Sequence, residues 1–254
     1  MSLDVVLPTG GRISGEFAAE TGVEVKALID VGGRTVLERT IDVLRATGRV
    51  QRAVVIGPQE IADHPCSQLA DAVLPEGGDS GPANVLRGIE WLCKKDGGSA
   101  KQVLVLTTDL PFLTPEAISA FIDSCPSGVD VCVPLVSKEA FEGRFPGSGS
   151  QFVRLADGEW TIGCGFLVNP EAIQANRDHL EQIFAVRKSQ VGMARLLGLG
   201  FIIRLLTHRL TVAHIEDRCV SMLGCSGKAV LQSPPELAFD MDSVQEYRYA
   251  IARV

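Results

Sequence analysis

The fold class follows from one stretch of the sequence, Val103-Leu104-Val105-Leu106-Thr107-Thr108-Asp109-Leu110-Pro111-Phe112. Its first four residues are apolar and β-prone without interruption, a pattern typical of a strand that is buried on both faces. The run leads directly to Asp109, so an acid stands at the carboxyl end of the predicted strand. In open α/β sheets, ligands bind at that edge. The stretch therefore predicts a parallel sheet with a ligand site beside Asp109.

Similar runs occur on both sides of this stretch. We expect strands at Val5-Val6-Leu7, 53–56, 73–75 and 130–135. Apolar residues at helical spacing predict helices at 35–47 and 84–95, and Thr114-Pro115-Glu116 opens a third helix with an N-cap and a proline at its first position. Strands that alternate with helices predict an α/β fold, with a mostly parallel, Rossmann-like sheet and helices on both faces.

The second half of the chain has a less regular pattern. Residues 141–158 are rich in glycine, serine and charge and predict an excursion, after which 160–168 returns as a strand. Residues 176–223 are mainly helical in pattern, 238–241 predicts a last short strand, and 243–253 a closing helix. We expect one domain over 1–254, with the excursion and a small helical cap inserted at about 137–237.

Composition excludes several classes of protein. The 254 residues carry a net charge of −7, and their lysines and arginines are scattered, which argues against nucleic acid as a partner. The seven cysteines form no C-x-x-C pair, so we expect reduced thiols in a cytoplasmic protein. The most apolar late stretch, 196–206, is too short to span a bilayer, and no membrane partner is expected.

A glycine-containing loop follows the first predicted strand. It reads Leu7-Pro8-Thr9-Gly10-Gly11-Arg12, and Lys26 comes later in the same connection. Glycines let the backbone N–H groups approach a phosphate, and a lysine supplies a point charge for its oxygens. The alternative is a plain turn followed by a surface lysine.

Acidic residues occur at two places where a metal could bind. Asp109 follows the central strand, and Asp240-Met241-Asp242 lies near the C-terminus. We expect at most one of the last two acids to reach the metal held by Asp109, and we favour Asp242, which lies at the loop-ward end of the run. Magnesium usually takes one or two carboxylates beside substrate phosphates. The alternatives are an aspartate that caps a turn and, for Asp242, the N-cap of the last helix.

These motifs together resemble the molybdenum-cofactor-type (MobA-like) nucleotidyltransferases. The resemblance rests on the glycine loop with Lys26-Ala27-Leu28, on 32–39 (Gly-Gly-Arg-Thr-Val-Leu-Glu-Arg), on 107–116 and on 240–243. It implies a nucleotide-diphospho-sugar transferase-like fold. It also implies an NTP site formed by Pro8, Thr9, Gly10, Gly11, Arg12, Lys26, Gly78 and Asn84, with Lys26 and Asp109 catalytic. Magnesium, or manganese in its place, would be bound by Asp109 and Asp242.

The chain departs from the family pattern at two places. Pro8-Thr9 precede the glycines, and a long acid-containing loop follows them; the returning strand reads Gly163-Cys164-Gly165 where relatives often have Gly-Asn. Base choice and the acceptor are therefore open. On the acceptor side we expect Arg144, Arg154, Cys164, Arg187 and Lys188.

The predicted activity is transfer of a nucleoside monophosphate from an NTP, with CTP or GTP favoured, to a small phosphorylated acceptor, releasing pyrophosphate. One alternative is a metal-dependent glycosyltransferase that uses a sugar nucleotide, since Asp240-Met241-Asp242 has the D-x-D form of such enzymes. Another is a nucleotide-binding regulator without activity. A homodimer is left open.

Overall fold

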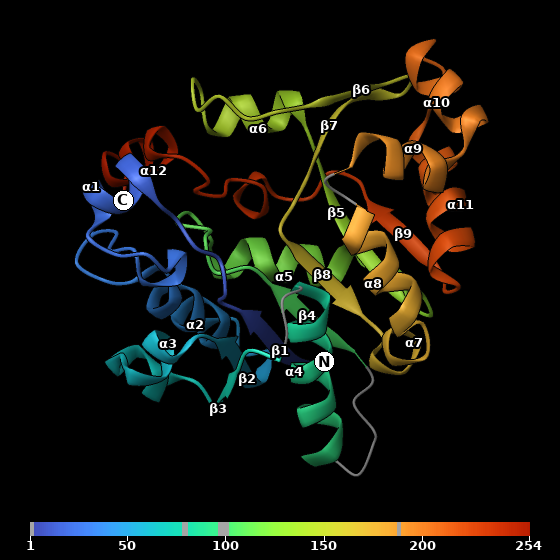
Figure 1. The fold of residues 1–254 in the computed structure, drawn as a ribbon. Helices are drawn as coiled ribbons and strands as arrows, with labels where there is room; N and C mark the ends of the chain where they lie inside the picture. The colour runs from blue at the N-terminus through green and yellow to red at the C-terminus, as the bar shows by residue number, and fades with distance from the viewer. Residues whose placement is uncertain (1–2, 78–80, 96–101, 187–188) are drawn as a thin grey trace.

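A sheet of nine strands forms the centre of the computed structural model, which describes residues 3–77, 81–95, 102–186 and 189–254 (Figure 1). The strands follow the order β3-β2-β1-β4-β8-β5-β7-β6, and β9 pairs with β5. Their bounds are β1 Leu3–Pro8, β2 Val50–Gly57, β3 Ala72–Pro75, β4 Val103–Leu106, β5 Val131–Ser137, β6 Val153–Leu155, β7 Gly158–Ile162, β8 Gly165–Val168 and β9 Gly227–Val230. Among these strands only β7 and β8 run against the common direction, so the predicted mostly parallel sheet is confirmed.

Helices cover both faces of the sheet. They are α1 Gly15–Thr21, α2 Val36–Ala46, α3 Gln59–Asp63, α4 Gly81–Lys95, α5 Pro115–Ser124, α6 Lys138–Arg144, α7 Pro170–Ala175, α8 Arg177–Val186, α9 Gln190–Leu197, α10 Leu199–Leu206, α11 Val212–Leu223 and α12 Val244–Ile251, with short 3₁₀ turns at η1 Lys26–Leu28, η2 Pro65–Leu69 and η3 Pro235–Leu237. Figure 1 shows α7 to α11 gathered beside β8 and β9, where the helical insert was expected. No helix in the described ranges has the length and apolar character needed to cross a membrane.

The alternation of side chains along β1 explains this layering. Val5 and Leu7 belong to a core cluster with residues of α2 and α5, whereas Val6 belongs to a second cluster with residues of α4. All three valine and leucine side chains are fully buried. A central strand with apolar residues at consecutive positions therefore holds a layer of helices on each face.

Polar residues set the starts of the helices around the site. Thr35 caps α2 in a reciprocal capping box with Glu38, and the Thr114 hydroxyl accepts from the N–H of Ala117 at the start of α5. Both starts were predicted from the sequence.

Two sequence expectations are wrong. Residues 160–168 are not one strand: the chain breaks at Gly163 and Cys164, and β8 then inserts between β4 and β5. Residues 238–241 are not a strand either but irregular chain after η3. Backbone groups there make single bonds to neighbouring loops, such as Cys164 N–H to Leu237 O at 2.7 Å, so no ladder forms.

Candidate active site

Asp109 lies just beyond the carboxyl end of β4, as predicted. Its side chain is 16% exposed, and Oδ2 lies 3.5 Å from Nζ of Lys26. Oδ1 is buried and accepts no hydrogen bond from any described residue. A buried carboxylate oxygen without a partner is costly unless something else binds it.

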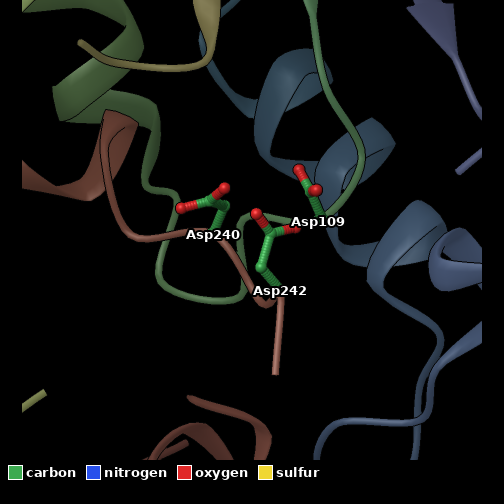
Figure 2. A group of neighbouring side chains, drawn as sticks. All are labelled: Asp109, Asp240 and Asp242. Carbon is green, nitrogen blue, oxygen red and sulfur yellow. The ribbon is translucent and has the colours of Figure 1, made fainter. Parts of the chain in front are cut away.

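The C-terminal acids lie against Asp109. The N–H of Met241 donates to the carbonyl of Asp109 at 3.1 Å, which holds the segment beside the β4 edge. Asp109, Asp240 and Asp242 each offer a carboxylate oxygen within 4.8 Å of the other two (Figure 2). The expectation that only one of the last two acids reaches Asp109 is therefore wrong, since even on a strand residues two positions apart lie on the same face.

Asp242 is not the cap of the last helix. Ser243 caps α12 in a reciprocal capping box with Glu246. The N–H of Asp242 also donates to Glu246 Oε2 at 2.7 Å, while its own side chain is 66% exposed. Ser243 therefore has the capping role that was the alternative for Asp242, and the Asp242 carboxylate is not used as a helix cap.

Lys26 is the cation of this cluster. Its ammonium donates to Asp242 and to Asp109, and its side chain is only 16% exposed. Burial by itself lowers the pKa of Lys26, but the carboxylates of Asp109, Asp242 and Asp240 together outweigh burial and raise that pKa above its ordinary value. Lys26 is therefore protonated at neutral pH.

Asp240 is the acid that the sequence analysis set aside in favour of Asp242. Burial, followed by the charges of Asp109 and Asp242, raises its pKa to about 7. The sequence held a usable signal, because Asp240 and Asp242 are two positions apart and would lie on the same face of a strand.

The cluster fits a hard divalent cation. Three carboxylates converge, one of their oxygens is buried without a partner, and oxygen is the donor that magnesium and manganese prefer. Asp109, Asp240 and Asp242 are the residues that would bind the metal.

The glycine loop is held against the neighbouring strands. Thr9 is buried, and both its N–H and its hydroxyl donate to the carbonyl of Ile56, at 2.8 and 3.0 Å. Pro8, the last residue of β1, pairs in register with Ile56. A side chain at Gly10 would collide with the carboxylate of Glu76, and one at Gly11 would lie 3.3 Å from Cδ of Lys26. The two glycines thus leave room for the side chains of Glu76 and Lys26 beside the loop.

Asn84 lies beneath this loop at the start of α4. It is buried, and its Oδ1 accepts from the N–H of Gly77 at 2.8 Å. Its amide nitrogen lies 3.9 Å from the position that a Cβ on Gly10 would take. Asn84 therefore joins the loop after β1 to the end of β3. Gly78 lies outside the described residues.

Arg12 is held at the outer side of the loop. Its Nη2 donates to Glu60 at 2.8 Å, and Glu24 lies 3.9 Å away. The hydrogen bond to Glu60 is the main cause of a raised Arg12 pKa. The guanidinium is 46% exposed, so a ligand would compete with Glu60 for it.

The long acid-containing loop folds onto the C-terminal helix. Its α1 packs Phe17 against Tyr247 of α12, with ring centroids 6.1 Å apart. Arg248 of α12 donates to Glu16 at 3.2 Å and to Glu20. The glycine loop and the helix that follows Asp242 are thereby tied together.

Cys164 lies beside the acids. The carbonyl of Cys164 accepts from Thr107 at 3.0 Å, two residues before Asp109. Burial, and then the charges of Asp240 and Asp109, raise the pKa of this thiol well above its ordinary value. Cys164 is therefore a neutral thiol at the break between β7 and β8.

Two of the four predicted acceptor cations, Arg144 and Arg154, lie within the described residues. Nε of Arg144 donates to Glu236 at 2.8 Å, and its guanidinium packs on the ring of Phe145. Arg154 is exposed on β6, in register with Glu159, at the end of the strand order. Arg187 and Lys188 lie outside the described residues.

The sheet has a nucleotide-diphospho-sugar transferase-like fold, with the acids and the glycine loop at the ends of its strands. A family model for the MobA-like NTP transferase domain matches residues 14–208, and the chain belongs to this family. The resemblance inferred from the sequence is confirmed. The match includes Lys26 and Asp109, whereas Asp240 and Asp242 lie beyond it.

Solved structures similar to this chain agree with the family. A hypothetical transferase from Thermus thermophilus superposes with a TM-score of 0.82 at 28% identity, covering 97% of this chain and 99% of that one. The 2-C-methyl-D-erythritol 4-phosphate cytidylyltransferase of the same organism has a TM-score of 0.56 at 20% identity, with 99% and 98% covered. A CMP:2-keto-3-deoxy-manno-octonic acid synthetase complexed with CTP has a TM-score of 0.58 at 13% identity, with 99% and 98% covered. The last two share the fold.

Proposed function

We propose that the protein is a magnesium-dependent nucleotidyltransferase that transfers a nucleoside monophosphate from CTP or GTP to a small phosphorylated acceptor, with release of pyrophosphate. The observation that carries this proposal is the convergence of three carboxylates and Lys26 beside the glycine loop. Family membership supplies the reaction class. The cytidylyltransferase and the CTP complex among the similar folds are the reason to test CTP first.

The loop after β1 would bind the nucleotide. In this proposal the N–H groups around Gly10 and Gly11 approach the phosphates, and Asn84 lies near the nucleoside, with Pro8, Thr9, Arg12 and Gly78 completing the site. The backbone of Gly11 is fixed to Lys26 by a bond from the Lys26 N–H to the Gly11 carbonyl, 2.9 Å long. The phosphate-binding backbone and the ammonium thus belong to one rigid unit.

The acids would hold magnesium, or manganese in its place, through Asp109, Asp242 and also Asp240. A bound divalent cation supplies positive charge where the phosphates carry negative charge. The Asp109 carboxylate, buried and fixed at the β4 edge, would orient the metal. Asp242 is the more exposed ligand, on the solvent side.

The reaction needs no general base. An acceptor phosphate oxygen is already a nucleophile at neutral pH, and it would attack the α-phosphorus of the NTP as the bond to pyrophosphate breaks. Lys26 would stabilise the growing charge on the leaving pyrophosphate, since its raised pKa keeps it protonated. Most of the rate enhancement would therefore come from positioning and charge stabilisation.

The acceptor would lie on the side of Cys164, beyond the acids. The neutral thiol offers a weak polar contact there, and Arg144, Arg154, Arg187 and Lys188 are the proposed cations for its phosphate. Arg144 would have to exchange its bond with Glu236 for the acceptor.

The first test is a thermal-shift panel of CTP, GTP, ATP and UTP with and without magnesium. A donor at about 100 times its dissociation constant adds about 2.7 kcal/mol to stability. We expect a magnesium-dependent rise of roughly 5 °C or more with one nucleotide, followed by pyrophosphate release with the correct acceptor. Sugar-nucleotide hydrolysis without pyrophosphate release from any NTP would instead identify a glycosyltransferase, and tight NTP binding without turnover across an acceptor panel would indicate a regulator.

A further inference from the structure

A second polar pocket lies between α4 and the first turn of α8. It has a volume of about 370 Å³, within the range of small-molecule sites. Its lining is Leu74, Gly77, Ala83, Arg87, Glu90, Trp91, Lys94 and Arg177. Three of these side chains are cationic and one is acidic, in a protein whose net charge is −7.

The cations of this pocket are incompletely neutralised. Within the described ranges, neither Arg87 nor Lys94 forms an ion pair with a carboxylate. Arg177 pairs with Glu181 at 3.0 Å and more weakly with Glu90 at 3.5 Å. Among the described residues, the lining of the pocket therefore carries a net positive charge from two separate helices, together with the indole of Trp91.

The pocket is separate from the proposed NTP site. Asn84 is buried and bonds to Gly77, whereas Ala83 and Arg87 line the pocket from another face of α4. Neither Gly10 nor Lys26 contributes to its lining. Among the described residues the two sites meet at Gly77, over which the Arg87 guanidinium packs so closely that a methyl group on Gly77 would lie 2.9 Å from Nη1.

We propose that this pocket binds a small phosphorylated anion, with Arg87 and Lys94 of α4 and Arg177 of α8 as its ligands. Guanidinium groups donate in a fixed fork that suits phosphate oxygens, and a lysine adds a compact charge. The cations come from two helices and can each contact a different oxygen of one anion. A phosphate group therefore fits this pocket better than a single carboxylate group does. The binding does not depend on the proposed transfer reaction.

Trp91 makes the proposal directly measurable. The chain has two tryptophans, so a Trp160→Phe background leaves Trp91 as the only indole. Inorganic phosphate and inorganic pyrophosphate would be titrated in EDTA, with Trp91 fluorescence and calorimetry recorded in parallel. We expect saturable binding with a change in Trp91 emission. The Arg87→Met/Lys94→Met double variant should raise the dissociation constant at least about tenfold, the scale of losing a charge-assisted hydrogen bond.

Three controls assign the site. Arg209→Met removes an exposed cation elsewhere and should leave binding unchanged, and circular dichroism verifies that each variant folds. Lys26→Met removes the cation of the proposed NTP site and should also leave the Trp91 signal unchanged. Equal dissociation constants for phosphate and pyrophosphate would show that one phosphoryl group suffices for binding. A lower dissociation constant for pyrophosphate would show that the pocket binds a diphosphate.

The proposal is overturned by either of two results. One is no saturable binding of either anion by calorimetry. The other is binding that survives in the Arg87→Met/Lys94→Met variant and disappears in Lys26→Met, since that would place the anion in the NTP site. Neither result would count against nucleotidyl transfer, because donor binding is measured separately with magnesium.

Discussion

The N–H of Met241 donates a hydrogen bond to the carbonyl of Asp109, with the two atoms 3.1 Å apart. This bond joins two segments more than 130 positions apart in the sequence, the end of β4 and the irregular chain before α12. Since Met241 is fully buried, its neighbours Asp240 and Asp242 are fixed beside Asp109. One backbone bond and one buried side chain thus assemble the acid cluster.

Asp109→Asn should abolish turnover while the protein stays folded. The amide keeps the shape of the side chain but removes a charge that would hold the metal, and losing one such group typically costs a hundredfold or more in rate. Pyrophosphate release measures the rate, and circular dichroism measures the fold. Turnover near the wild-type rate in a folded Asp109→Asn protein would remove Asp109 from the mechanism.

Asp240→Asn should stabilise the metal-free protein while weakening metal binding. The pKa of Asp240 is raised to about 7, so the folded state keeps a proton that the unfolded state has already lost. As the pH rises from the unfolded to the folded pKa, wild-type stability falls, whereas the neutral amide is unaffected. In EDTA the melting temperature of Asp240→Asn should therefore exceed that of wild type more at about pH 8 than at about pH 5.

Added magnesium provides the complementary measurement for Asp240. It should raise the melting temperature of wild type more than that of the variant, because the variant has lost one proposed ligand. A pH-independent difference in EDTA would show that Asp240 is not forced to ionise against its neighbours.

Lys26→Met should lower both stability without metal and catalytic efficiency. It leaves the largely buried Asp109 carboxylate without its cation, so the melting temperature in EDTA should fall and magnesium should recover part of the loss. The kcat/KM for the NTP should drop by about a hundredfold. Lys228→Met, which removes an exposed lysine paired with Glu216, is the matched control. A variant with unchanged kcat/KM would exclude Lys26 as the phosphate ligand.

Arg248→Met should weaken nucleotide binding without abolishing the chemistry. Arg248 fixes α1 through Glu16 and Glu20, and α1 lies in the connection between Gly11 and Lys26. Releasing that connection should raise the KM for the NTP several-fold and leave kcat nearly unchanged. The variant should stay folded, because exposed ion pairs contribute little to global stability. Arg253→Met, which loses a contact with the Tyr249 ring near the end of the same helix, is the control. Equal effects of the two variants on KM would show that the tie to α1 is irrelevant.

Local pattern was sufficient for much of the scaffold. The apolar run Val103–Leu106 predicted a buried strand, and it is one, because four consecutive apolar residues can be buried only with helices on both faces. Thr114 predicted a helix start, since a hydroxyl at that position satisfies an otherwise unpaired N–H, and apolar spacing predicted the helix that begins after Thr35. Asp109 was placed at the edge of the sheet because it follows the apolar run of this buried strand.

The composition of the site was decided by tertiary structure. Periodicity assumes a regular element, and the strand expected at 238–241 does not form, so periodicity could not show which of Asp240 and Asp242 lies against Asp109. The Met241–Asp109 bond and the burial of Phe239 and Met241 bring both acids to the same place. The pairing of Lys26 with Asp109, 83 positions apart in sequence, likewise depends on parallel strands β1 and β4 lying side by side. The sequence determined which residues end each strand. Only the packing of those strand ends determined which charged side chains lie close together. Charge–charge energies depend on distances in space, and no local sequence pattern records those distances.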